Sequence, residues 1–112
     1  MSLLELTTDT NATTVRVALA GEFDIAAAER VERELERIER DPPETLVLDL
    51  RGLTFMDSTG LRIIVAADAR AREQARRLVV VQGPDAIQRI MHMTRLDERL
   101  EIVSDPSAIP AG

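Results

Sequence analysis

The chain has 112 residues, of which 45% are apolar and 30% charged, which is the composition of a folded protein of one domain. Its formal net charge is −6 and every basic residue is arginine, so nucleic acid and anionic membranes are not expected as partners. The absence of cysteine, tryptophan and tyrosine excludes disulfides, thiol chemistry and tyrosine or tryptophan stacking platforms. No signal peptide or membrane span is visible in the sequence, and we expect a cytoplasmic location.

The first third of the chain predicts a hairpin followed by a helix. Apolar residues alternate in residues 4–8 and again in residues 15–21, and residues 9–12 have the composition of a turn. Asp24 can cap the next helix, which the two prolines within residues 41–43 end. The apolar side chains of this helix recur at helical spacing, at Ile25, Ala28, Val31, Leu35 and Ile38.

The middle of the chain predicts a buried strand and a second helix. Residues 45–50 are apolar and partly β-branched, which is typical of a strand buried on both faces. Residues 51–56 are expected to be a connector that returns apolar side chains to the core, and a helix begins near Ser58. Its expected buried stripe consists of Leu61, Ile64, Val65, Asp68 or Ala69, Ala71 and Ala75.

The last third predicts a strand, a helix and a short final strand. Residues 78–81 form the buried strand, Pro84 or Asp85 opens the helix, and residues 100–103 form the last strand. Residues 104–112 are rich in proline and alanine, and we expect a loose tail. The element order predicts a single α/β domain over residues 1–112. Its sheet is mixed, with an antiparallel N-terminal edge, parallel βα units and helices packed on the sheet.

The segment from Phe55 to Leu61 follows a buried strand and opens a helix. Physical chemistry alone favours a structural role, in which Asp57 or Ser58 is the N-cap and Gly60 permits close packing of the helix on the sheet. The same position also suits a switch, because unpaired N–H groups at a helix start favour an anion. A phosphate on Ser58 would add about −1.5 to −2 charges to an already acidic surface.

The chain resembles the STAS domain, and specifically the stand-alone anti-sigma factor antagonists. The resemblance is carried by residues 21–24 (Gly-Glu-Phe-Asp), residues 46–50 and above all residues 53–61, with weaker matches at residues 80–84 and 87–91. It implies that Ser58 is phosphorylated by a serine kinase that is itself the anti-sigma factor. The unphosphorylated form would bind this kinase and free a sigma factor. Phosphorylation would release the kinase, and a serine phosphatase would reset the protein.

The resemblance also implies a partner-binding surface around Ser58. Glu22 and Asp24 would meet basic residues of the kinase, although Asp24 could equally be a helix cap. Thr59 is a poorer second acceptor for phosphate. Arg62 departs from the small residue common in the family. It could pair with Asp57 or with a phosphate, or it could change which partner fits. The full predicted surface consists of Glu22, Asp24, Asp57, Thr59, Gly60 and Arg62.

Two other functions compete with this switch. The first is a constitutive STAS scaffold subunit of a lipid-transport or stress-sensing complex, in which Ser58 is only part of a helix start. The second is an enzyme, which the sequence disfavours because His92 is the only histidine and nothing brings it near Ser58. We therefore expect no catalytic residues, no metal ion and no cofactor.

Overall fold

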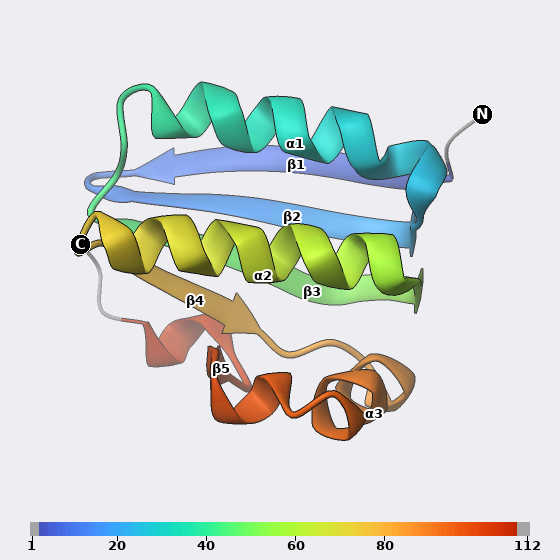
Figure 1. The fold of residues 1–112 in the computed structure, drawn as a ribbon. Coiled ribbons are helices and arrows are strands. Elements are labelled where there is room, and N and C mark those ends of the chain that lie inside the picture. Colours follow the sequence, from blue (N-terminus) through green and yellow to red (C-terminus); the bar gives the residue numbers. More distant parts are fainter. Residues whose placement is uncertain (1–2, 110–112) are drawn as a thin grey trace.

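In a computed structural model, which describes residues 3–109, the strands form a five-stranded sheet in the order β1-β2-β3-β4-β5 (Figure 1). The first pair is antiparallel and every later pair is parallel. This arrangement confirms the predicted α/β fold with a mixed sheet and an antiparallel N-terminal edge. The strands are β1 (Leu4–Asn11), β2 (Thr14–Phe23), β3 (Thr45–Met56), β4 (Arg77–Val81) and β5 (Glu101–Val103).

The helices follow the predicted order along the chain. α1 (Ile25–Glu39) and α2 (Ser58–Glu73) lie side by side across one face of the sheet, and α3 (Asp85–Met93) follows β4 (Figure 1). Two short 3₁₀-helices, η1 (Leu96–Glu98) and η2 (Pro106–Ala108), flank β5. Within residues 3–109, none of the helices is both long and apolar enough to cross a membrane.

The main core lies between the sheet and the two long helices. Side chains of a strand alternate between the two faces, and Val17 and Leu19 of β2 point to the same side as Leu48 and Leu50 of β3, with at most 2% of each exposed. Full burial of an aliphatic side chain stabilises a fold by roughly 1.5–3 kcal/mol. The helices contribute Ala27, Val31, Leu35, Ile38, Ile64 and Ala67 to this core.

The hairpin is longer than predicted. The sequence predicts a turn at residues 9–12, but β1 continues to Asn11, which pairs with Thr14. The turn is therefore confined to Ala12 and Thr13, and Ala12 has a left-handed φ of 54°. Antiparallel pairing supplies hydrogen bonds to the backbone of these polar residues while their side chains stay in water, so turn-like composition did not end the strand.

The expectation that residues 51–56 form a connector is wrong, because they continue β3. Glu22 pairs with Phe55 and Phe23 with Met56, after shifts in register along β2. Gly52 permits the register shift between Ala18 and Ala20 of β2. A Cβ at Gly52 would lie only 2.8 Å from the Cβ of Ala20. The extension carries the chain to the rim of the sheet and brings the start of α2 beside the end of β2.

The buried face of α2 is rotated from the predicted stripe. Ile63 and Ala67 are buried, whereas Ala75 is exposed beyond the end of the helix. Asp68, one of the two predicted alternatives at its position, is only 5% exposed. The rotation arises because α2 packs against α1 as well as against β3 and β4. Two further predicted members of the stripe, Leu61 and Val65, are half-buried.

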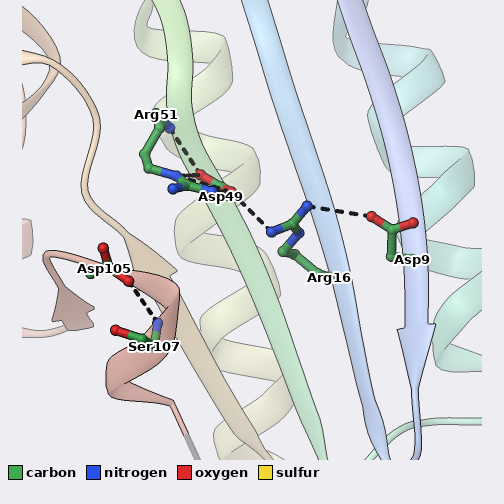
Figure 2. A network of polar contacts seen from close by, with 6 residues as sticks. All are labelled: Asp9, Arg16, Asp49, Arg51, Asp105 and Ser107. Carbon is green, nitrogen blue, oxygen red and sulfur yellow. Dashed lines mark hydrogen bonds and ion pairs between the residues drawn. The ribbon is translucent and has the colours of Figure 1, made fainter.

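A network of charged side chains lies on the sheet face away from α1 and α2 (Figure 2). Asp49 is 4% exposed, and Arg51 donates to both of its carboxylate oxygens, from Nε at 3.0 Å and from Nη2 at 2.8 Å. Arg16 bridges Asp49 to Asp9. Burial alone would raise the pKa of Asp49, but the hydrogen bonds and positive charge of Arg51, together with Arg16, hold it below its ordinary value.

The C-terminal segment approaches the same network. Asp105 accepts a hydrogen bond from the backbone N–H of Ser107 at 2.8 Å and so caps η2 (Figure 2). That hydrogen bond, together with the positive charge of Arg51, lowers the pKa of Asp105. The predicted tail of residues 104–112 therefore has local structure up to Ile109, and residues 110–112 lie outside the described residues. That the tail is loose, and that residues 1–112 form a single domain, stay predictions.

Candidate functional site

Asp57 joins the starts of the two long helices. Its Oδ1 accepts hydrogen bonds from the backbone N–H groups of Thr59 at 2.9 Å and Gly60 at 3.1 Å, which makes it the N-cap of α2. Its Oδ2 accepts from the backbone N–H of Ile25, the first residue of α1, at 3.3 Å. The backbone N–H of Asp57 itself donates to the carbonyl oxygen of Phe23 at 3.2 Å. One carboxylate thus satisfies amides of both helices at the rim of the sheet.

Ser58 is exposed and is the first residue of α2. Within residues 3–109, neither its hydroxyl nor its backbone N–H has a hydrogen-bond partner. The sequence left open whether Asp57 or Ser58 is the cap, and the structure assigns the cap to Asp57. The Ser58 hydroxyl is therefore not needed to hold the helix start, and it faces solvent.

The two residues after Ser58 have different environments. Thr59 is half-buried, and its N–H is engaged by Asp57. Gly60 is buried, and a Cβ there would lie 2.9 Å from both the Phe23 carbonyl oxygen and the Met56 Cγ. Gly60 therefore allows α2 to approach β2 and β3 closely, as the structural interpretation of the motif predicts.

The two acidic residues before α1 lie at the same rim. Asp24 Oδ1 accepts hydrogen bonds from the backbone N–H groups of Ala26 at 3.1 Å and Ala27 at 3.3 Å, so Asp24 is the N-cap of α1. Glu22 is half-buried near the end of β2 and pairs with Phe55 of β3. The cap interpretation of Asp24 is confirmed. Contact of either residue with a partner stays a prediction.

Exposed apolar side chains gather around this rim, and sequence reasoning missed them. Among residues 3–109 the exposed large hydrophobic side chains are Leu3, Ile25, Phe55 and Met93, at 62%, 75%, 47% and 76% exposure. The first three lie here: the Leu3 carbonyl accepts from the Glu22 N–H at 3.1 Å, and Ile25 follows the cap of α1. Ile25 was expected in the buried stripe, but at the first position of α1 its side chain stays in water.

Arg62 lies apart from the acidic cap. It is exposed on α2 and lines a small hollow with Glu32 and Glu36 of α1. Across the described part of the chain it forms no ion pair with Asp57, so that predicted pairing is wrong. The carboxylate of Asp57 is occupied by backbone amides. Arg62 is also five residues after Asp57, whereas side chains on a helix meet when they are three or four residues apart.

Comparison with known proteins identifies the fold family. The family model described as Mlab, STAS domain, matches residues 6–104. The chain belongs to the STAS domain family. The anti-sigma-B factor antagonist of Listeria monocytogenes is 32% identical to this STAS domain over 88 residues, which cover 79% of this chain and 77% of that protein.

Solved structures share the fold of this STAS domain. The crystal structure of an anti-sigma factor antagonist from Mycobacterium paratuberculosis has a TM-score of 0.85 at 24% identity, covering 94% of this chain and 89% of that one. The structure of the Bacillus cell fate determinant SpoIIAA in the phosphorylated form has a TM-score of 0.74 at 18% identity, covering 93% of this chain and 96% of that one.

In this STAS domain the predicted site residues have two kinds of role. Asp24 and Asp57 hold helix starts, and Gly60 allows close packing. Ser58, Glu22 and Arg62 have side chains without hydrogen-bond or ion-pair partners in residues 3–109. The rim therefore combines a rigid backbone with an unengaged hydroxyl, an acidic side chain and exposed apolar groups.

Proposed function

We propose that this STAS domain is an anti-sigma factor antagonist that binds an anti-sigma factor through the rim around Ser58 and releases it when Ser58 is phosphorylated. One observation carries the proposal: the Ser58 hydroxyl is exposed and unbonded in residues 3–109, at a helix start that Asp57 already caps. The bound partner is a serine kinase that is itself the anti-sigma factor. A serine phosphatase restores the binding form.

The surface around Ser58 suits a partner with an apolar patch and basic edges. Leu3, Ile25 and Phe55 offer apolar area that is exposed in the free protein. Buried apolar and aromatic anchors carry most of the binding energy in protein interfaces. Glu22 adds an acidic side chain at the edge of this patch and would steer a basic partner toward it.

Phosphorylation changes this surface without disturbing the fold. The amides of Thr59 and Gly60 are already engaged by Asp57, which leaves the Ser58 N–H as the free donor at the start of α2. A phosphate of about −1.5 to −2 charges beside the Asp57 carboxylate would remain hydrated and directed outward. A partner docking on the apolar rim would then have to desolvate that phosphate, which strongly disfavours the complex.

The proposed function requires binding and no catalysis by this chain. His92, the only histidine of the sequence, lies on α3 with its Nδ1 2.9 Å from Asp97 Oδ2. We also propose that this function needs no cofactor. The alternative is a constitutive STAS scaffold subunit of a lipid-transport or stress-sensing complex. In that case the state of Ser58 would not affect binding.

The test measures phosphate transfer and binding with a purified cognate anti-sigma factor kinase. With the kinase and ATP, we expect one phosphate per chain, located at Ser58 by mass spectrometry. Ser58→Ala should accept none and still bind. Ser58→Asp should weaken binding by about 100-fold, which corresponds to about 2.7 kcal/mol.

Thr59→Ala is the matched control, because it removes the neighbouring hydroxyl. It should accept phosphate as the native protein does. Phosphate retained in Ser58→Ala but lost in Thr59→Ala would move the acceptor to Thr59. Equal binding of Ser58→Asp and Ser58→Ala would contradict the switch and support the scaffold.

A further inference from the structure

Charged side chains surround a hollow at the opposite end of α2 from Ser58. A hollow of about 540 Å³ lies where α2 ends, β4 begins and the chain enters β5. Four of its lining residues are arginines, namely Arg72, Arg76, Arg77 and Arg99, and two are acidic, Asp68 and Glu101. This concentration of positive charge is unexpected in a chain whose net charge is −6.

Both acidic residues of the hollow are already neutralised. Arg77 donates to both carboxylate oxygens of Glu101, with Nε to Oε1 at 2.9 Å. Arg72 Nε lies 2.9 Å from Asp68 Oδ2, an ion-pair distance, although Oδ2 lacks a partner in hydrogen-bonding geometry within residues 3–109. These two pairs account for two of the four guanidinium groups.

The other two guanidinium groups lack an anionic partner. In the described part of the chain, Nε and Nη2 of Arg76 are buried and have no hydrogen-bond acceptor. Arg99 is exposed, and its side chain has no acceptor within residues 3–109. A buried donor without a partner is costly, and more so on a charged group. The hollow thus has two positive charges in excess.

The end of a helix explains only part of this arrangement. Cations near a helix C-terminus interact favourably with its dipole, which accounts for Arg72 in the last turn of α2. Arg99 lies between η1 and β5, so this effect does not explain its position. The dipole also provides no acceptor for the buried nitrogens of Arg76.

We propose that this hollow binds a small phosphate monoester. Arg76 and Arg99 would balance the charge of a dianion, and planar guanidinium groups match the geometry of phosphate oxygens. The hollow has the size of small-molecule sites, which are about 300–1,000 Å³. Leu78 and Leu100 line it as well and offer an apolar surface for the organic part of the ligand. The site is separate from the Ser58 rim, and neither proposal depends on the other.

The test is an NMR titration of the full chain with inorganic phosphate and, separately, glucose 6-phosphate at constant ionic strength. We expect saturable shifts of the backbone amides of residues 75–78 and 99–101, with the sugar phosphate binding more tightly than phosphate. Arg99→Gln and Arg76→Gln should each weaken binding by about five-fold or more. Arg99 is exposed, so Arg99→Gln tests the site even if Arg76→Gln perturbs the fold.

Arg89→Gln is the matched control, because it removes the same charge from an exposed position on α3 outside the hollow. Binding unchanged in Arg89→Gln and weakened in Arg99→Gln would support the site. Equal weakening in both variants would show general attraction of anions and overturn it. Shifts that do not saturate, or that map to residues 58–60, would also overturn it.

Discussion

The two ends of α2 carry side chains of opposite charge. At the start, one carboxylate, that of Asp57, accepts hydrogen bonds from amides of two helices and leaves the neighbouring Ser58 unengaged. At the other end, arginines gather around a hollow, and the charge of two of them is uncompensated in residues 3–109. The helix dipole favours anions at the start and cations at the end, which accounts for Asp57 and Arg72 but not for Arg99.

The difference lies in which groups remain free after the helix is stabilised. The start of α2 offers a neutral hydroxyl among apolar side chains, which suits a macromolecular partner and a modification that changes charge. The far end offers excess positive charge in a concave site, which suits a small anion. About 21 Å of helix separates Ser58 from Arg72, since each residue adds 1.5 Å.

The largest effect is expected from Asp57→Ala, which removes the acceptor for three backbone N–H groups in two helices. We expect the free energy of unfolding to fall by roughly 2–3 kcal/mol, because a single lost N-cap costs about 1 kcal/mol and up to about 2. Urea denaturation followed by circular dichroism measures the change.

Ser58→Ala is the matched comparison at the adjacent position. Its unfolding free energy should change by less than about 0.5 kcal/mol, as for other surface substitutions. Comparable losses in the two variants would show that the hydroxyl shares the capping role. The contrast between a structural Asp57 and a free Ser58 would then fail.

The next effect concerns the apolar part of the rim. Phe55→Ala should weaken binding to the proposed anti-sigma factor partner by about 2 kcal/mol, or about 30-fold, because an exposed aromatic anchor is lost. Met93→Ala is the control, since Met93 is 76% exposed but lies at the end of α3. Isothermal titration calorimetry measures both. Equal effects, or no effect of Phe55→Ala, would place the partner elsewhere.

A smaller effect is expected at the other end of the helix. Arg72→Gln removes the cation beside Asp68, which is 5% exposed. We expect a loss of about 1–2 kcal/mol in unfolding free energy, less than for a fully buried pair because the Arg72 side chain is 58% exposed. Chemical denaturation measures it, and Asp68→Asn in the same chain should restore part of the loss.

Arg62→Gln is the control for charge alone on the same helix. Arg62 is exposed and has no ion pair within the described residues, so its removal should leave the unfolding free energy nearly unchanged. If Arg62→Gln destabilised the protein as much as Arg72→Gln, the effect would belong to the charge of α2 and not to the pair with Asp68.

The smallest effect is a pH dependence of stability that arises on α1, away from both ends of α2. A hydrogen bond from Arg37 lowers the pKa of Glu34 on α1 from 4.5 to about 2. Burial opposes this change, and a hydrogen bond from Thr8 adds to it. A carboxylate with a lowered folded-state pKa adds stability that is present above the unfolded pKa and is lost as the pH falls through the folded one. We expect a loss of about 1 kcal/mol between pH 4.5 and pH 2, because the Arg37 side chain is 60% exposed.

Glu34→Gln isolates this contribution. The variant should show a shallower decline in stability over the same acidic range when denaturation curves are measured at each pH. Identical declines in the two proteins would show that other carboxylates carry the acid sensitivity.

Local patterns predicted much of the fold and the centre of the candidate site. The capping of α1 by Asp24 and the start of α2 at Ser58 follow from residues close together in the sequence. The close packing at Gly60 was also predicted, because a glycine in the first turn of a helix beside a buried strand lets the two backbones approach each other.

Features that depend on distant neighbours were not predicted. The extension of β3 through Phe55 requires pairing with Glu22, which is 33 residues earlier in the chain. The exposure of Ile25 depends on where α1 meets the sheet. Arg76 and Arg99 gave no sequence signal, because only the folded chain brings them to one hollow.

The sequence by itself determined the order of the elements, the mixed sheet and the motif around Ser58, because periodicity, caps and prolines act over a few residues. Only the tertiary structure decided that Asp57 and not Ser58 holds the helix start, since Asp57 also binds the amide of Ile25 in another helix. It likewise decided which apolar and charged side chains remain free, because burial and pairing depend on residues that meet only in the folded chain.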